Sequence, residues 1–145
     1  PGGRLCVVVW RKREDNEWIY RAEKVVEKYL EAPEDSDEPT CGPGPFSMAS
    51  ADTTSDILLG AGFEEVEFRR SDLPVTIGHD LDHAIAFNLA LGPAGEVLRL
   101  SGENANRVRP RIEADLRKAL ADFVQPDGEV VAPASTWIVS ARAPS

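Results

Sequence analysis

Two histidines, His79 and His83, have the spacing in this sequence that most resembles a chemical site. Positions i and i+4 share one face of a helix, which is an arrangement that metal-binding histidines use. No third ligand accompanies them, so the sequence predicts no metal site. An imidazole titrates near ~6.5, so either residue could act as a general base, and His79 is a candidate substrate contact. Helix capping or a position in solvent is the alternative interpretation.

Three aromatic residues are further candidates for substrate contacts. Trp10 closes an apolar run, at the end of a strand where open α/β sheets place their ligands. Phe46 ends the Gly42–Phe46 segment, which is typical of a loop that closes over a site. Phe87 lies in an apolar helical pattern that can line a pocket. Ordinary packing is the alternative for each residue. No nucleophile–base pair is evident, so catalytic residues stay unassigned.

The elements that must position these residues alternate between strand and helix, which predicts an α/β fold. The run Leu5–Val9 has no polar alternation and predicts a strand that is buried on both faces. Thr53 and Asp56 resemble a capping box that would open a short helix. Pro110 lies within a helical pattern, so a helix starts near it or kinks there. We expect helices over about 15–30, 53–59, 80–91, 94–100 and 108–123, strands over 5–9, 63–69 and 134–141, and a loop over 31–51.

Composition excludes several classes of protein. The chain has 145 residues and a net charge of -9, so phosphate-rich nucleic acids would be repelled. No apolar run is long enough to span a membrane, and no signal peptide precedes the first strand. Five of the 25 acidic residues cluster between Glu31 and Glu38, in a segment typical of a solvated loop. Cys6 and Cys41 have no partner at metal spacing, which predicts free thiols and a cytoplasmic location.

Several short motifs together resemble one family. Pro1-Gly2-Gly3 followed by a strand that ends in Trp10 resembles the start of the fifth strand in class I S-adenosylmethionine-dependent methyltransferases. Each motif is weak alone, but their order and spacing extend the resemblance over nearly the whole chain. The other motifs are Asn16-Glu17-Trp18, the loop 42–46, the Leu59–Phe63 turn and the closing stretch Trp137–Arg142.

The resemblance implies the carboxyl-terminal part of a Rossmann-like sheet, with strands five, six and seven. The seventh strand, over 134–141, would insert antiparallel between the other two, and residues 73–133 would form a helical insertion on the substrate side. The family's Gly-rich loop and its ribose-binding acidic residue have no counterpart in this chain. No cofactor-binding residue is therefore assigned, and the cofactor site is expected mostly in an amino-terminal half outside these residues.

The expected function is thus that of a fragment. The full-length protein would transfer a methyl group from S-adenosylmethionine to a small-molecule acceptor, and residues 1–145 alone would be inactive. Methyl transfer needs positioning and desolvation more than a catalytic base. The alternative is a non-enzymatic helical binding or dimerisation module. A sheet lacking its first four strands would expose an edge, which predicts a homodimer through that edge.

Overall fold

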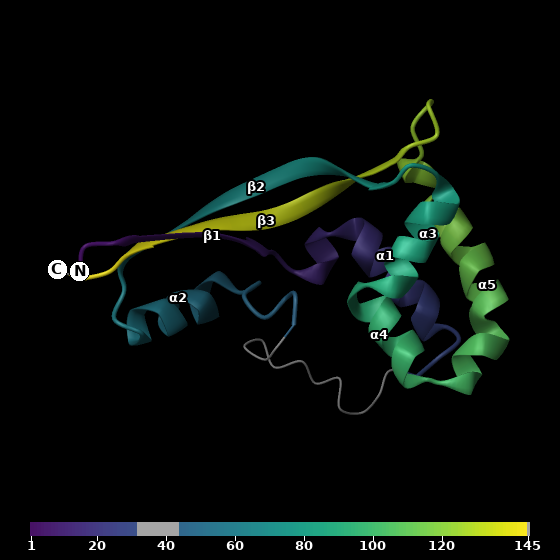
Figure 1. Cartoon of the computed structure of the whole chain (residues 1–145), viewed down its shortest axis with the longest axis horizontal. Coiled ribbons are helices and arrows are strands. Elements are labelled where there is room, and N and C mark those ends of the chain that lie inside the picture. Colours follow the sequence, from purple (N-terminus) through teal and green to yellow (C-terminus); the bar gives the residue numbers. More distant parts are fainter. Residues whose placement is uncertain (32–43, 145) are drawn as a thin grey trace. The chain divides into compact units, whose positions relative to one another are not determined.

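The computed structural model describes residues 1–31 and 44–144. Within these residues the fold is α/β, with one three-stranded sheet and a group of helices (Figure 1). The predicted acidic loop, Cys41 and the start of the 42–46 segment lie outside the described residues. The elements in chain order are β1 (Arg4–Trp10), η1 (Arg13–Asp15), α1 (Glu17–Glu27), α2 (Ala51–Gly60), β2 (Glu64–Gly78), α3 (Leu81–Ala90), α4 (Gly92–Leu100), α5 (Glu103–Ala119), η2 (Ala121–Phe123) and β3 (Val130–Arg142).

The described residues divide into two compact units. The sheet unit comprises those within 1–15, 37–73 and 134–145, and the helical unit comprises those within 16–36 and 74–133. The division falls within β2 and within β3. Each of these strands therefore has one end in the sheet unit and the other end in the helical unit. None of the helices in the described part of the chain is long and apolar enough to cross a membrane.

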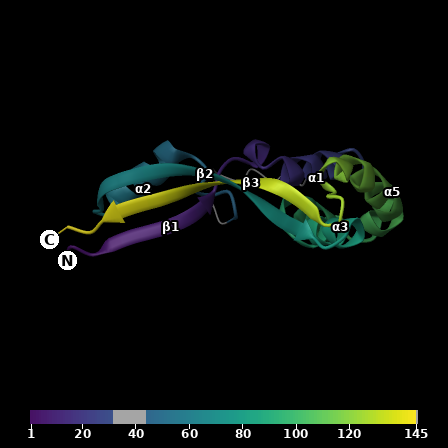
Figure 2. The same ribbon diagram turned by 90° about the horizontal axis from the view of Figure 1, so that it is seen from above.

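β3 is the central strand of the sheet, whose order is β1-β3-β2 (Figure 2). It pairs with β1 in antiparallel register from Arg4 opposite Arg142 to Trp10 opposite Thr136. The predicted insertion of the last strand between the other two is therefore confirmed. β2 and β3 are both longer than the local pattern indicates: β2 continues beyond Arg69 to Gly78, and β3 begins at Val130 rather than Ala134. Pro74 within β2 is tolerated because β2 is an edge strand.

The prediction that the first strand is buried on both faces was wrong. Its residues alternate, and Arg4, Cys6 and Val8 are exposed. Val139 and Ala141 of β3 are buried, and Figure 1 shows α2 on one side of the sheet. Among the described residues one helix covers this sheet, on one face, so an uninterrupted apolar run here does not mean two-sided burial.

The start of α2 also differs from the prediction. Ser50, and not Thr53, is the N-cap residue, and its side chain accepts a hydrogen bond from the Thr53 amide. The Thr53 amide lies in the first turn of α2, where an amide has no carbonyl partner within the helix. The Ser50 side chain supplies the missing acceptor. Gly62 then turns the chain into β2 with a φ of 88°, a value that glycine adopts without strain.

The helical unit is built around α1, which packs against α3, α4 and α5. Within α1, the apolar residues Trp18, Ala22, Val25 and Val26 lie on one face at helical spacing and are buried. Asp80 caps α3 by accepting a hydrogen bond from the His83 amide. Helix α5 begins at Glu103 and runs through Pro110 without a break in helical assignment, so the helix does not start near this proline. Leu91, the last residue of the helix predicted over 80–91, lies after α3 and is 59% exposed.

Candidate functional site

The carboxyl end of β1 gathers a set of polar and aromatic contacts within the sheet unit. Trp10 is the last residue of the strand, and Arg11 follows it directly. The Arg11 amide donates a 3.0 Å hydrogen bond to the Ser135 carbonyl, which continues the pairing with β3 by one residue. The backbone is thereby held where the two side chains leave the strand.

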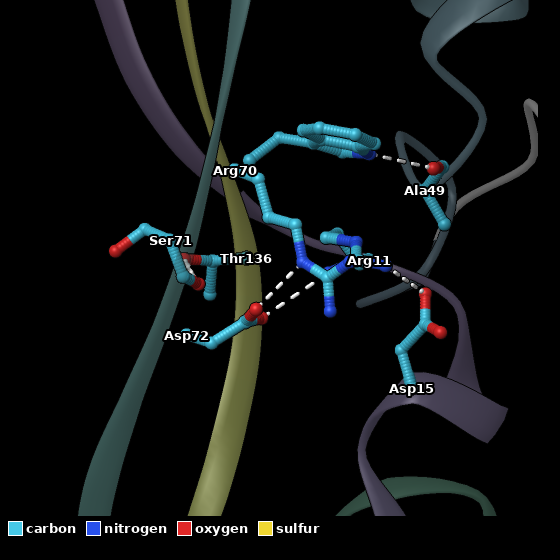
Figure 3. A network of polar contacts seen from close by, with 8 residues as sticks. Arg11, Asp15, Ala49, Arg70, Ser71, Asp72 and Thr136 are labelled. Carbon is cyan, nitrogen blue, oxygen red and sulfur yellow. Dashed lines mark hydrogen bonds and ion pairs between the residues drawn. The ribbon is translucent and has the colours of Figure 1, made fainter.

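The Arg11 guanidinium is nearly buried, with its side chain 10% exposed, and it joins two carboxylates (Figure 3). One of its terminal nitrogens lies 2.9 Å from Asp15 Oδ2, and the other donates to Asp72 Oδ1 at 3.1 Å. Asp15 is four residues along the chain, whereas Asp72 comes from β2, 61 residues away in sequence. A buried cation needs such partners because leaving it unpaired is costly.

Asp72 is the residue that links this cation to a second one. Its Oδ2 accepts a 2.6 Å hydrogen bond from Nε of Arg70, which lies two residues earlier on β2. A hydrogen bond from the Ser135 side chain, followed by that from Arg70 and by the charges of Arg70 and Arg11, lowers the pKa of Asp72 below its ordinary value. The carboxylate therefore stays ionised at neutral pH, and it is no candidate for a general acid there.

Aromatic side chains surround the network. The Arg11 guanidinium carbon lies 5.1 Å from the centre of the Trp137 ring, a cation–π distance. The indole N–H of Trp137 donates to the Ala49 carbonyl at 3.1 Å, and its ring meets Phe68 edge-on with centroids 5.9 Å apart. The Thr136 hydroxyl donates to the Ser71 carbonyl at 3.1 Å, which joins β3 to β2 beside Asp72 (Figure 3).

Two of the four predicted substrate contacts come together here. The rings of Trp10 and Phe46 lie with their centroids 6.4 Å apart, at an interplanar angle of 45°. Phe46 is 8% exposed, in a turn that the Ser47 amide and hydroxyl close by bonding to the Gly44 carbonyl. The described part of the loop predicted to close over a site is thus a packed turn. Its residue Phe46 contacts Trp10 at the end of β1.

The other two predicted contacts, His79 and Phe87, belong to the helical unit. The His79 and His83 rings lie 4.2 Å apart, and the His79 side chain is 70% exposed. Phe87 stacks on Trp18 with centroids 6.0 Å apart, so it packs inside the helical unit. Among the described residues, no group of three or more His, Cys, Asp or Glu side chains could hold a metal ion.

Sequence reasoning missed Arg11, Asp72 and Trp137 as members of the site. A charged residue immediately after an apolar strand was the available signal for Arg11, since a strand end places it beside neighbouring strands. No local signal identifies Asp72, because its partner lies 61 residues away. Chemically, the network fixes a strand end and an aromatic wall.

A shallow groove of about 260 Å³ lies on the sheet away from this network. Arg142, one of its lining residues, pairs with Glu65 at 3.0 Å and with Glu64 at 3.5 Å. Cys6, which is exposed, lies opposite Ser140 on the neighbouring strand. The lining residues are Arg4, Leu5, Cys6, Glu65, Glu67, Ser140, Ala141 and Arg142.

No protein-family model matches this sequence, and no curated protein matches it either.

Proposed function

We propose that residues 1–145 are the carboxyl-terminal half of a small-molecule methyltransferase that uses S-adenosylmethionine. The observation that supports the proposal most is the strand order β1-β3-β2, with β3 antiparallel to β1. The sequence resemblance implies this order for strands five, seven and six. A last strand that returns antiparallel between two earlier ones is a specific topological feature, since consecutive strands more often lie side by side.

The uncovered side of β1 gives independent support for a larger sheet. Val8 is 66% exposed, although it lies in the middle of an apolar strand. Transfer of its side chain from water into a protein interior would be favourable by about 1.5–3 kcal/mol. A strand and helix of an amino-terminal half would cover this side of the sheet.

The residues of this chain do not fit the cofactor by themselves. The sequence has no Gly-rich loop between a strand and a helix, and two acidic residues near the end of β1, Asp15 and Asp72, are paired with Arg11. We therefore assign the cofactor site to the other half and derive no chemical step from this chain. For residues 1–145 alone, the proposal predicts no binding of the cofactor and no activity.

The proposed role of this half is to bind the methyl acceptor. Trp10 and Phe46 provide an aromatic wall at the end of β1, and the Arg11 network holds that end in place. His79 and Phe87 remain proposed contacts of the helical unit. The acceptor is a small molecule and not a nucleic acid, because a chain with a net charge of -9 repels phosphates. A cytoplasmic location is part of the same proposal.

A decisive experiment starts from the reading frame upstream of the codon for Pro1. The frame is expected to encode a strand, a Gly-rich loop and a helix. The polypeptide expressed from the whole frame should bind S-adenosylmethionine in a calorimetric titration, whereas residues 1–145 should give no heat of binding. Micromolar binding by residues 1–145, or an initiator codon directly before Pro1, would contradict the proposal.

The alternative function, a non-enzymatic binding or dimerisation module, has one observation in its favour. The helical unit has a core of its own, with Ile112, Leu116 and Leu120 fully buried. Under this alternative the longer polypeptide, if one is encoded, would not bind the cofactor. The same titration therefore separates the two functions.

A further inference from the structure

β1 is an edge strand of the sheet. It pairs with β3 along all seven of its residues, and no strand of the described chain lies on its other side (Figure 2). The outward backbone groups of such a strand form a template for pairing with another strand.

β1 also lacks the features that usually protect an edge. From Leu5 to Trp10 it has no charged residue and no proline, and Val8 is 66% exposed. The opposite edge strand, β2, has these features: a series of Glu, Arg and Asp residues, Pro74, and a left-handed φ of 53° at Glu65. Charges, proline and irregular backbone all oppose strand addition, so only β1 is suited to it.

We propose that β1 pairs antiparallel with β1 of a second copy of this chain, about a two-fold axis at Val7. This register pairs all seven residues of the strand, whereas a shift by two residues leaves only five pairs. A two-fold axis perpendicular to the sheet keeps the α2-covered faces of both copies on one side. It therefore allows only residues of the same face to lie opposite each other.

The side chains are complementary in this register. Each Arg4 lies opposite Trp10 of the other copy, and the two guanidiniums are ~20 Å apart along the strands, so they do not repel. Each Cys6 lies opposite Val8 of the other copy, and this contact covers one flank of the exposed Val8 side chain. The result is one continuous six-stranded sheet.

This inference does not depend on the proposed function. In the proposed whole enzyme, a strand of the amino-terminal half would take the same edge, so the dimer is a property of residues 1–145 by themselves. Cofactor binding and dimer formation are measured separately, and either result can fail without the other.

The test uses sedimentation equilibrium of the chain over a range of concentrations. We expect a dimer for the wild type and a monomer for Val8→Lys, in which two lysines would lie ~7–8 Å apart on diagonal positions. Val8→Thr and Leu73→Lys are matched controls, since Thr favours strands and Leu73 is a 63% exposed residue of the other edge strand. Both should remain dimers. A wild-type monomer at all concentrations, or a Val8→Lys dimer, would overturn the proposal.

Cys6 reports the register in the same dimer. In a Cys41→Ser background, the two Cys6 residues lie on diagonal positions, ~7–8 Å apart at the backbone, so a short bis-maleimide should join them. Cys6→Ser should abolish the product. Quantitative formation of a direct Cys6–Cys6 disulfide on oxidation would overturn the axis at Val7, because only a register centred on Cys6 places these residues opposite each other.

Discussion

At the scale of single residues, Arg11 connects three segments of the chain. It contacts Asp15 on η1, Asp72 on β2 and the Trp137 ring on β3. Its aliphatic stem packs while its planar guanidinium meets two carboxylates, a combination that lysine does not reproduce. One side chain thus fixes the end of β1 through its shape as well as its charge.

Arg11→Met is expected to destabilise the protein by about 1–3 kcal/mol, because it keeps the stem but removes the hydrogen bonds to the carboxylates. Arg11→Lys should lose less, since it retains the charge. Urea denaturation followed by tryptophan fluorescence measures both changes. Arg69→Met, at an exposed position of β2, is the control and should lie within about 0.5 kcal/mol of wild type. An equal effect at both positions would mean that the Arg11 contacts contribute nothing specific.

Asp72 makes the stability of the sheet unit depend on pH. Its pKa is lower in the folded protein, because of the hydrogen bonds from Ser135 and Arg70 and the charge of Arg11. The stabilisation is therefore complete above the unfolded pKa of about 3.9 and is lost as pH falls through the lower, folded value. Asp72→Asn should be less stable than wild type at pH 7 and should approach it below about pH 4. Urea midpoints that differ equally at pH 7 and pH 3 would contradict this.

At the scale of elements, the junction between β2 and α3 depends on Gly78. A Cβ built there would lie 2.5 Å from the Ala84 amide nitrogen and 2.7 Å from the Asp80 carbonyl. Both are backbone atoms that cannot move without distorting the first turn of α3. The cap by Asp80 and the close approach at Gly78 therefore belong to one compact turn.

Gly78→Ala should destabilise the protein by about 2–4 kcal/mol, since the clash forces the backbone of α3 to shift. Gly60→Ala is the matched control: nothing lies within 4 Å of its Cβ, and it ends α2. That change should be neutral or stabilising by up to about 1 kcal/mol. Thermal unfolding monitored by circular dichroism compares them, and similar melting temperatures for the two variants would refute the close approach.

At the scale of the whole molecule, most fully buried side chains belong to the helical unit. Ile112, Leu116 and Leu120 lie on one side of α5 and its end, and Val26 meets the same unit from α1. The described part of the sheet unit, by contrast, has one α-helix, which lies on one face of the sheet. The stability of the chain should therefore depend mainly on the helical core.

Leu116→Ala is expected to cost about 2–5 kcal/mol, the range for removing a fully buried leucine. Leu91→Ala, at a 59% exposed leucine of the same unit, should cost less than about 0.5 kcal/mol. Urea denaturation followed by far-ultraviolet circular dichroism tests the pair. A small loss for Leu116→Ala would place the main core elsewhere.

Some features of the fold and of the candidate site could be predicted from the sequence, and others could not. The sequence by itself determined the type of most helices and strands, because periodic apolar residues such as Trp18, Ala22 and Val25 are a local signal. It also indicated the insertion of β3 between its neighbours. Only the tertiary structure decided which face of β1 is exposed, where β2 ends, and that Arg11 meets Asp72 across 61 residues. These features depend on contacts between distant segments, and no local pattern records which distant residue will become a neighbour.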